Sequence, residues 1–138
     1  EHDERPIRNA SLLYCVLSVP DRMLRFLNAG VAYPVLVRGG VSRYLRFGKR
    51  SLSQNIEEAK SVSVSLRPGD LFAIFSDGIL RVRNRTGKQL GLKKVMGFLE
   101  RPFSSSEDII EGLLGFAGDF AEGVGIREDI SIILLRID

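Results

Sequence analysis

The chain has 138 residues, of which 44% are hydrophobic and 27% are charged, and its formal net charge is +3. These values are typical of one soluble globular domain that is long enough to bury a core. No stretch approaches the roughly 20 consecutive apolar residues of a transmembrane helix. The single cysteine, Cys15, excludes an internal disulfide and a thiolate zinc site, so a reducing, cytoplasmic compartment is expected. Because the chain begins without methionine, we expect a domain cut from a longer protein.

The first part of the chain has the pattern of β-strands. Short apolar runs alternate with turn signals, which is typical of a meander of adjacent antiparallel strands. The first four expected strands cover residues 11–18, 22–29, 33–38 and 41–47. Residues 48–59 have no clear period and are interpreted as a loop.

Two further strands are expected after this loop. Val62, Val64 and Leu66 alternate with serine, which predicts a half-exposed strand. The sequence RPGD at 67–70 predicts a turn. The apolar run within residues 71–76 predicts a central strand that is buried on both faces.

After residue 90 the hydrophobic period changes to that of helices. An amphipathic helix is predicted over residues 91–100. Its buried face would consist of Leu92, Val95, Met96 and Leu99. Ser104 and Glu107 form a capping-box pattern that predicts the start of a second helix, and residues 130–137 predict a last, fully buried strand. This order of elements predicts an α+β fold with helices covering antiparallel strands.

Acidic residues stand at the ends of two of these strands. Asp77 and Gly78 follow the central strand, and an Asp-Gly pair between apolar runs is typical of a tight turn. Glu128 and Asp129 directly precede the last strand. If the two strands are antiparallel neighbours, these carboxylates lie at the same edge of the sheet, where oxygen ligands can hold Mg²⁺ or Mn²⁺. Spacing alone leaves a turn and a metal site open as alternatives.

Several segments, in this order, resemble one protein family. They are NAGVAYPVLVR, RPGDLFAIFSDGIL and REDISIILLRI. They resemble the stage II sporulation E-like branch of the metal-dependent protein serine/threonine phosphatases, which are bacterial relatives of protein phosphatase 2C. The resemblance extends over nearly the whole chain from about Ser11 onward. It implies an α-β-β-α sandwich in which antiparallel sheets are flanked by helices, with two Mn²⁺ or Mg²⁺ ions that activate a water for attack on phosphoserine.

The resemblance assigns roles to individual residues. Asp77 matches the metal-ligating aspartate of a Thr-Asp-Gly motif, with Ser76 in place of threonine and the Gly78 backbone near the site. The closing Asp-Asp-Ile-Thr motif reads EDIS here, so Glu128 stands where the usual aspartate ligand is expected and Asp129 is the alternative ligand.

Part of the family pattern has no counterpart in residues 1–30. The upstream motifs that supply a bridging carboxylate and a carbonyl ligand are not found there. We therefore expect residues 1–138 to form a single phosphatase-like domain without the family's N-terminal elements. The chain is then either a fragment of a complete phosphatase or a degenerate member of the family.

Two functions of different classes follow from the resemblance. One is a protein phosphoserine/phosphothreonine phosphatase of bacterial signalling that acts on a phosphorylated, anti-anti-sigma-type regulator. The other is an inactive pseudophosphatase that binds a partner, which Glu128 and the unmatched upstream acids favour. Nucleic-acid binding is disfavoured because aromatic residues are not interleaved with the basic ones.

The basic residues of the chain are concentrated in one window. Arg81, Arg83 and Arg85 belong to it, and they form either a solvated face or a docking surface for an acidic or phosphorylated partner. A sheet without the family's N-terminal elements would have an uncovered edge or face. Self-association of the chain is therefore also expected.

Overall fold

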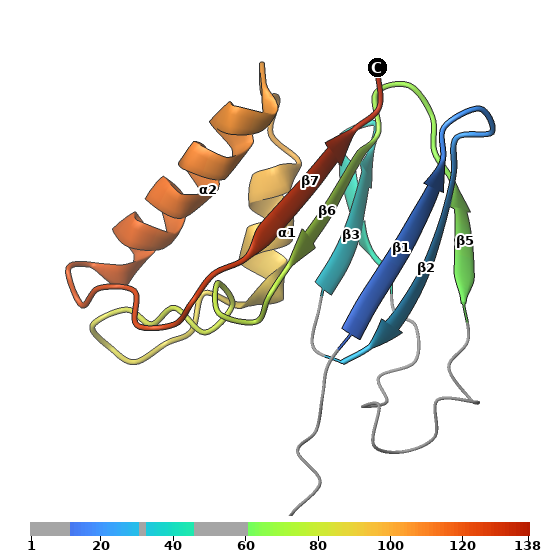
Figure 1. Cartoon of the computed structure of the whole chain (residues 1–138). Coiled ribbons are helices and arrows are strands. Elements are labelled where there is room, and N and C mark those ends of the chain that lie inside the picture. Colours follow the sequence, from blue (N-terminus) through green and yellow to red (C-terminus); the bar gives the residue numbers. More distant parts are fainter. Residues whose placement is uncertain (1–11, 31–32, 46–60) are drawn as a thin grey trace, which may run out of the picture. The chain divides into compact units, whose positions relative to one another are not determined.

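The computed structural model describes residues 12–30, 33–45 and 61–138 (Figure 1). These residues divide into two compact units, the first with residues 12–30 and 61–66 and the second with residues 33–45 and 67–138. Each unit contains one antiparallel sheet. The loop predicted over 48–59 lies outside the described residues, as do the last two residues of the strand predicted over 41–47.

The first unit contains a three-stranded sheet with the order β1-β2-β5. Its strands are β1 (Leu12–Ser18), β2 (Met23–Ala29) and β5 (Val62–Ser65). β1 and β2 form a hairpin, and the Ser18 hydroxyl donates to the Asp21 carboxylate at 2.8 Å beside its turn. Leu24 and Phe26 of β2 are buried. Positions along β5 alternate between half-buried and exposed, which confirms the prediction from the alternating serines.

The second unit contains a four-stranded sheet with the order β4-β3-β6-β7, and two helices. Its elements are β3 (Tyr33–Arg38), β4 (Val41–Tyr44), β6 (Leu71–Phe75), α1 (Gly91–Leu99), α2 (Ser106–Ala121) and β7 (Ile132–Arg136). Both helices cover the same face of this sheet (Figure 1). The core between helices and sheet includes Val35, Phe75, Val95 and Leu113, each at most 1% exposed. The predicted α+β fold is confirmed, and neither helix is long and apolar enough to cross a membrane.

The predicted meander of four consecutive strands is wrong. β2 pairs with β5 and β3 pairs with β6, so the first four strands divide between two sheets as two hairpins. An apolar run with turn signals at its ends identifies a strand. Such a run does not specify which strand pairs with it, because pairing depends on side-chain packing between segments that are far apart in the sequence.

The last strand is an edge strand, which corrects the prediction of a fully buried one. Among the described strands β7 pairs only with β6. Ile132 and Leu134 pack against the helix-covered core, whereas Ile133 points to the other face and is 64% exposed. A continuous apolar run is compatible with a central strand and with an edge strand, so the sequence pattern could not separate the two.

The second helix begins one residue later than its capping box predicts. The Ser105 hydroxyl accepts from the Asp108 backbone N–H at 3.0 Å, and the Ser105 N–H donates to the Asp108 carboxylate at 3.1 Å. The segment SSSED allows two capping boxes of equal spacing, Ser104 with Glu107 and Ser105 with Asp108. Ser104 lies outside the helix, and its carbonyl accepts from Arg136 at 3.0 Å.

A buried carboxylate holds the turn that precedes β6. Asp70 is 3% exposed and accepts two hydrogen bonds from the Arg38 guanidinium, at 2.9 and 2.6 Å, and one from the Arg67 N–H at 2.8 Å. Burial raises the pKa of Asp70, but the hydrogen bonds from Arg38 and from Arg67 outweigh it and keep this pKa below its ordinary value. The sequence predicted the turn and missed this ion pair between β3 and the start of β6.

We expect Asp70→Asn to lower the free energy of unfolding by about 2–4 kcal/mol at pH 7, because Arg38 would lose its counter-charge and one acceptor. Urea denaturation measures this difference. Since the pKa of Asp70 is lowered on folding, its stabilisation is complete above the unfolded-state pKa of about 3.9. It is lost as the pH falls through the lower folded-state pKa. The two proteins should therefore converge only below about pH 4.

Asp119→Asn is the matched control for this substitution. Asp119 is exposed on α2, and its replacement should change the free energy of unfolding by less than about 0.5 kcal/mol. Equal losses in the two variants would contradict a special role for the ion pair between Asp70 and Arg38.

Candidate functional site

The ends of β6 and β7 place the predicted acidic segments side by side. The two strands are antiparallel, with Phe75 opposite Ile132. Beyond this pair, the Ser76 N–H donates to the Ser131 carbonyl at 3.0 Å, and the Ser131 N–H donates to the Ser76 hydroxyl at 3.1 Å. The backbones of Asp77 and of the 128–129 segment therefore share one edge of the sheet, as the sequence predicts.

Gly78 brings these two segments into contact. A Cβ atom at this position would lie 2.1 Å from the Asp129 carbonyl oxygen and 3.4 Å from the Glu128 Cβ. Any residue with a Cβ atom would clash here, so only glycine lets the turn approach this loop so closely. The turn is also one turn of helix, since the Asp77 carbonyl accepts from the N–H groups of Leu80 and Arg81 at 3.0 and 3.1 Å. Asp77 is thus a turn residue at a strand end, facing a second acidic segment.

The Asp77 carboxylate already has a cationic neighbour. Its Oδ2 lies 2.8 Å from a terminal nitrogen of Arg81, four residues later, and the two side chains are 27% and 55% exposed. Glu128 and Asp129 are exposed, and within the described part of the chain neither side chain has an ion-pair partner. The site therefore combines one paired carboxylate with two carboxylates in a neighbouring loop.

These residues fit only part of a binuclear metal centre. Carboxylate oxygens are suitable ligands for Mn²⁺ or Mg²⁺. However, no group of three or more histidine, cysteine, aspartate or glutamate side chains that could hold a metal ion occurs among the described residues. Asp77, Glu128 and Asp129 share one edge without converging on one point, so no catalytic step through a metal ion is derived from them alone.

A cavity lies next to this edge. Its volume is about 350 Å³, and it lies between the segments 81–87 and 124–128. It is lined by Arg81, Val82, Arg83, Asn84, Arg85, Gly87, Val124, Gly125, Arg127 and Glu128. We call it the arginine cavity, because four of these residues are arginines and only Glu128 is acidic.

The arginine cavity joins residues that the sequence singled out with one that it did not. Arg81, Arg83 and Arg85 come from the basic window, and all three line the cavity. Arg127 was missed because it is far from that window in the sequence. Its position beside Glu128, directly before the acidic motif, was the only signal that pointed to it.

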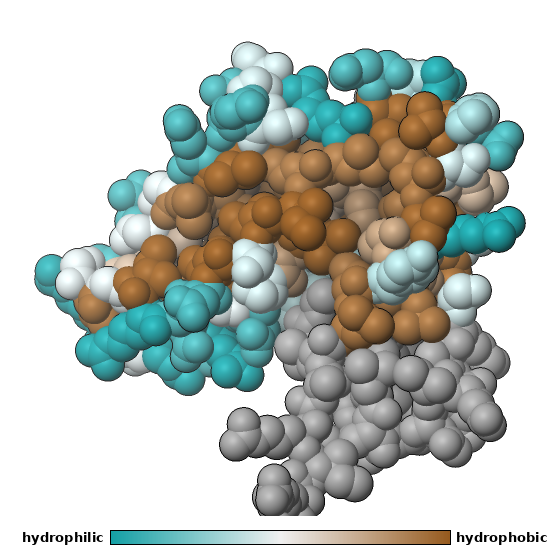
Figure 2. Space-filling model, viewed as in Figure 1, coloured by the Kyte–Doolittle hydropathy of each residue, from teal (hydrophilic) through white to brown (hydrophobic). Residues whose placement is uncertain are grey.

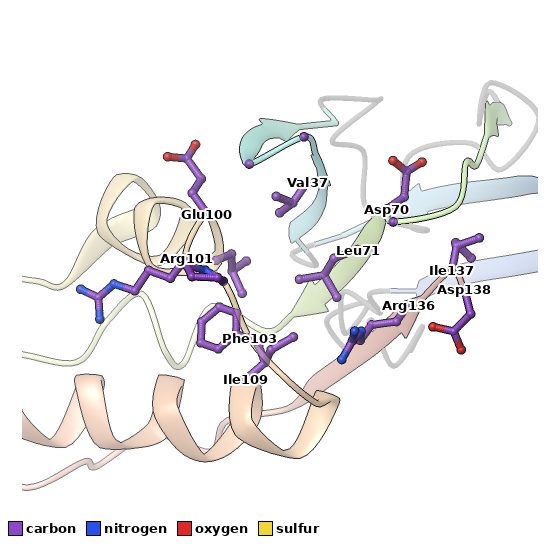
Figure 3. Close-up of a pocket in the computed structure, with 15 residues that line it drawn as sticks. Val37, Asp70, Leu71, Glu100, Arg101, Phe103, Ile109, Arg136, Ile137 and Asp138 are labelled. Atoms are coloured by element: carbon purple, nitrogen blue, oxygen red, sulfur yellow. The ribbon is translucent and has the colours of Figure 1, made fainter.

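A larger cavity lies at the opposite end of the same sheet, near the start of β6 and the end of β7 (Figure 3). Its volume is about 540 Å³. Asp70 binds Arg38, and the Glu100 carboxylate accepts from the Ser42 hydroxyl and N–H at 2.6 and 2.9 Å. These bonds from Ser42 lower the pKa of Glu100. Arg101 stacks on Phe98 and Arg136 binds the Ser104 carbonyl. These charged groups are thus engaged in intramolecular contacts.

We expect Gly78→Ala to lower the free energy of unfolding by about 1–3 kcal/mol, because the added methyl group would collide with the Asp129 carbonyl and force the two segments apart. Thermal or urea denaturation measures this change. Gly115→Ala is the control, since Gly115 lies on α2 and a Cβ added there would have no neighbouring atom within 4 Å. It should raise stability by about 0.5–1 kcal/mol. A neutral effect of Gly78→Ala would contradict the close contact.

Comparisons with solved structures support the fold. The SiaA-PP2C domain of Pseudomonas aeruginosa is similar with a TM-score of 0.78 and 20% identity, over 93% of this chain and 51% of that one. The SpoIIE phosphatase domain from Bacillus subtilis, presoaked with Mn, is similar with a TM-score of 0.73 and 19% identity, over 94% of this chain and 57% of that one. RsbX in complex with magnesium is similar with a TM-score of 0.66 and 20% identity, over 92% of this chain and 55% of that one. This chain thus spans a little more than half the length of these relatives.

Comparisons of the sequence gave one match. A search of curated proteins found none. The family model described as stage II sporulation protein E (SpoIIE) matches residues 1–138, and the structural relatives include phosphatase domains of the PP2C type. The resemblance seen in the sequence is therefore confirmed: the chain belongs to the stage II sporulation protein E family, and it shares the fold of PP2C-type phosphatase domains.

Proposed function

We propose that this chain is part of a metal-dependent protein phosphoserine/phosphothreonine phosphatase and contributes Asp77 and the 128–129 segment to its metal centre. The observation that carries the proposal is the meeting of these acidic segments at one sheet edge, with Gly78 against the Asp129 carbonyl. The family match over residues 1–138 supports it. Relatives of the same fold have been studied with Mn or magnesium, which makes these the cations of choice.

Asp77 is the first proposed ligand, because it follows a central, buried strand that fixes its position. Glu128 is the second proposed ligand, because it stands at the position of the family's aspartate ligand. Its side chain also ends in a carboxylate, one methylene further from the backbone. Asp129 is the alternative. When bound, the metal ions would supply the attacking water and neutralise charge on the phosphate. Carboxylate, imidazole or thiolate side chains that complete the centre would have to come from outside the described residues.

A pseudophosphatase is the second candidate function. Two observations favour it: Glu128 replaces the aspartate of the family motif, and the described residues contain no group of three or more histidine, cysteine, aspartate or glutamate side chains that could hold a metal ion. Such a protein would keep the partner-binding surface and lose turnover. In either case we propose a phosphorylated protein regulator of bacterial signalling, of the anti-anti-sigma type, as the partner. The four arginines beside the acidic segments support this partner class.

The enzyme is tested by Mn²⁺-dependent release of phosphate from a phosphoserine peptide. If the proposal is correct, Asp77→Asn should lower the rate by about 100-fold or more, because a metal ligand and its charge are lost. Asp119→Asn removes the same charge from an exposed position on α2 and should leave the rate unchanged. The measurement is made on this chain and on any longer natural form of the protein.

The outcomes separate the two candidate functions. Activity that requires Mn²⁺ and disappears only with Asp77→Asn supports the phosphatase. A lack of activity in every form at every Mn²⁺ concentration contradicts it and leaves the pseudophosphatase.

Self-association of the chain remains a prediction, and β7 is the strand on which we propose that it depends. An edge strand offers unpaired N–H and carbonyl groups to a second chain. Figure 2 shows apolar side chains along α2 and β7 on the face in view. Leu114 of α2 and Ile133 of β7 are 40% and 64% exposed.

We expect the average mass from light scattering to rise with protein concentration, and Ile133→Lys to suppress this rise because a charge on the edge opposes pairing. Val41→Lys is the control, since Val41 is also 64% exposed but belongs to β4 at the other edge of the sheet. A constant monomer mass for the unmodified chain would contradict the prediction.

A further inference from the structure

The arginine cavity is lined by more positive than negative side chains, which favours the binding of an anion. Four arginines line a volume of about 350 Å³, against the single carboxylate of Glu128. A concave surface with charges of one sign concentrates its electric field and raises the local concentration of counter-ions. None of its lining residues is aromatic, so the cavity offers no stacking platform for nucleic-acid bases.

Intramolecular bonds fix two of the arginines without using all of their donors. Arg83 donates from one terminal nitrogen to the Gly87 carbonyl at 2.7 Å. Arg85 donates from its Nε to the Glu122 carbonyl at the C-terminal end of α2, also at 2.7 Å. A guanidinium has five N–H donors, so each retains donors for a ligand. These bonds restrict the side chains in advance and reduce the entropy cost of binding.

The remaining two arginines are more available. Among the described residues, the Arg81 guanidinium contacts only the partly exposed Asp77 carboxylate. Arg127 is exposed and has no hydrogen-bond or ion-pair partner within the described part of the chain. A charged side chain beside three other cations is electrostatically unfavourable, and an anion in the cavity would relieve this repulsion.

The segment that carries three of the arginines is well ordered by its own hydrogen bonds. The Asn84 side-chain oxygen accepts from the N–H groups of Thr86 and Lys88 at 3.1 and 2.9 Å. Arg83 pairs with Gln89, and the Leu90 N–H donates to the Val82 carbonyl at 2.8 Å. Glu122, two residues before the opposite wall, accepts with its carboxylate from the Arg85 N–H at 3.3 Å. The walls of the cavity are therefore tied to each other.

We propose that the arginine cavity is a binding site for a phosphate dianion. Guanidinium groups match phosphate oxygens with paired N–H donors, and a dianion balances more of the positive charge than a single carboxylate does. Free orthophosphate and a phosphoserine side chain share this chemistry. The second source rests on the proposed function, because a phosphoserine substrate at the neighbouring acidic edge would bring its phosphate within reach of Arg81.

The test is a binding measurement on the complete chain, with a chelator present to remove metal ions. Isothermal titration calorimetry compares orthophosphate, a phosphoserine peptide and the same peptide without phosphate. We expect both phosphate probes to bind and the unmodified peptide to bind at least about tenfold more weakly. Arg127→Gln should weaken both phosphate probes by about tenfold, since it removes a charged donor that has no structural bond.

Lys93→Gln is the matched control, because it removes one positive charge from an exposed position of α1 that does not line the cavity. It should change the affinities by less than about twofold. Arg127→Lys should recover part of the loss, since lysine restores charge without the paired donors. Equal losses with Arg127→Gln and Lys93→Gln would overturn the proposal, as would an absence of phosphate binding or equal binding of the unphosphorylated peptide.

These experiments can contradict phosphate binding in the cavity without contradicting the proposed phosphatase activity, and the reverse. Binding is measured without metal ions and without turnover. Phosphate binding that depends on Arg127 therefore supports the cavity even where Mn²⁺-dependent activity is absent, and activity without such binding overturns the cavity while the phosphatase stands. Binding of orthophosphate alone supports the site and assigns it to free phosphate.

Discussion

The contact between Gly78 and the Asp129 carbonyl determines what this sheet edge can do. Pairing of β6 with β7 brings the two acidic segments to the same end of the sheet, but pairing alone would leave them separated by side chains. The missing Cβ at Gly78 lets the backbone of one segment lie directly on the other. The serine hydrogen bonds between Ser76 and Ser131 extend the ladder up to this contact. The position of Asp77 relative to Glu128 thus follows from backbone geometry.

Two aspartates flank β6, and their environments give them different roles. Asp70, before the strand, is buried and receives three hydrogen bonds, two from Arg38 and one from the Arg67 backbone. Such a carboxylate is not available to a ligand, because breaking these bonds would leave its buried charge without a partner. Asp77, after the strand, is partly exposed and has one arginine contact. An exposed pair of this kind contributes about 0–1 kcal/mol, so a ligand can replace it at low cost.

The strands and helices of this fold could be predicted from the sequence, but which strands lie side by side could not. Seven strands and two helices were recognised from apolar runs between turn signals, from alternation and from helical spacing, since apolar residues must face a core. The sheet partner of β2 and the edge position of β7 were not, because these depend on packing between distant segments. The shared edge of Asp77 and Glu128 was predictable from one assumption, that the two strands pair antiparallel. The role of Arg127 in the cavity and the Arg38–Asp70 pair depend on three-dimensional proximity. No local pattern marks the Arg38–Asp70 pair, and the only local signal for Arg127 is its place directly before the acidic motif.

Arg81 connects the acidic edge with the arginine cavity. It contacts the Asp77 carboxylate and lines the cavity, so its guanidinium group is shared between the two. If Asp77 is a metal ligand, as proposed, a divalent cation with twice the charge of a guanidinium would compete with Arg81 for this carboxylate and could displace it, since the partly exposed pair is weak. The displaced side chain would then be free to bind an anion in the cavity. A cation at Asp77 and a phosphate among the arginines would therefore each favour the other's binding, and by linkage this coupling must be reciprocal.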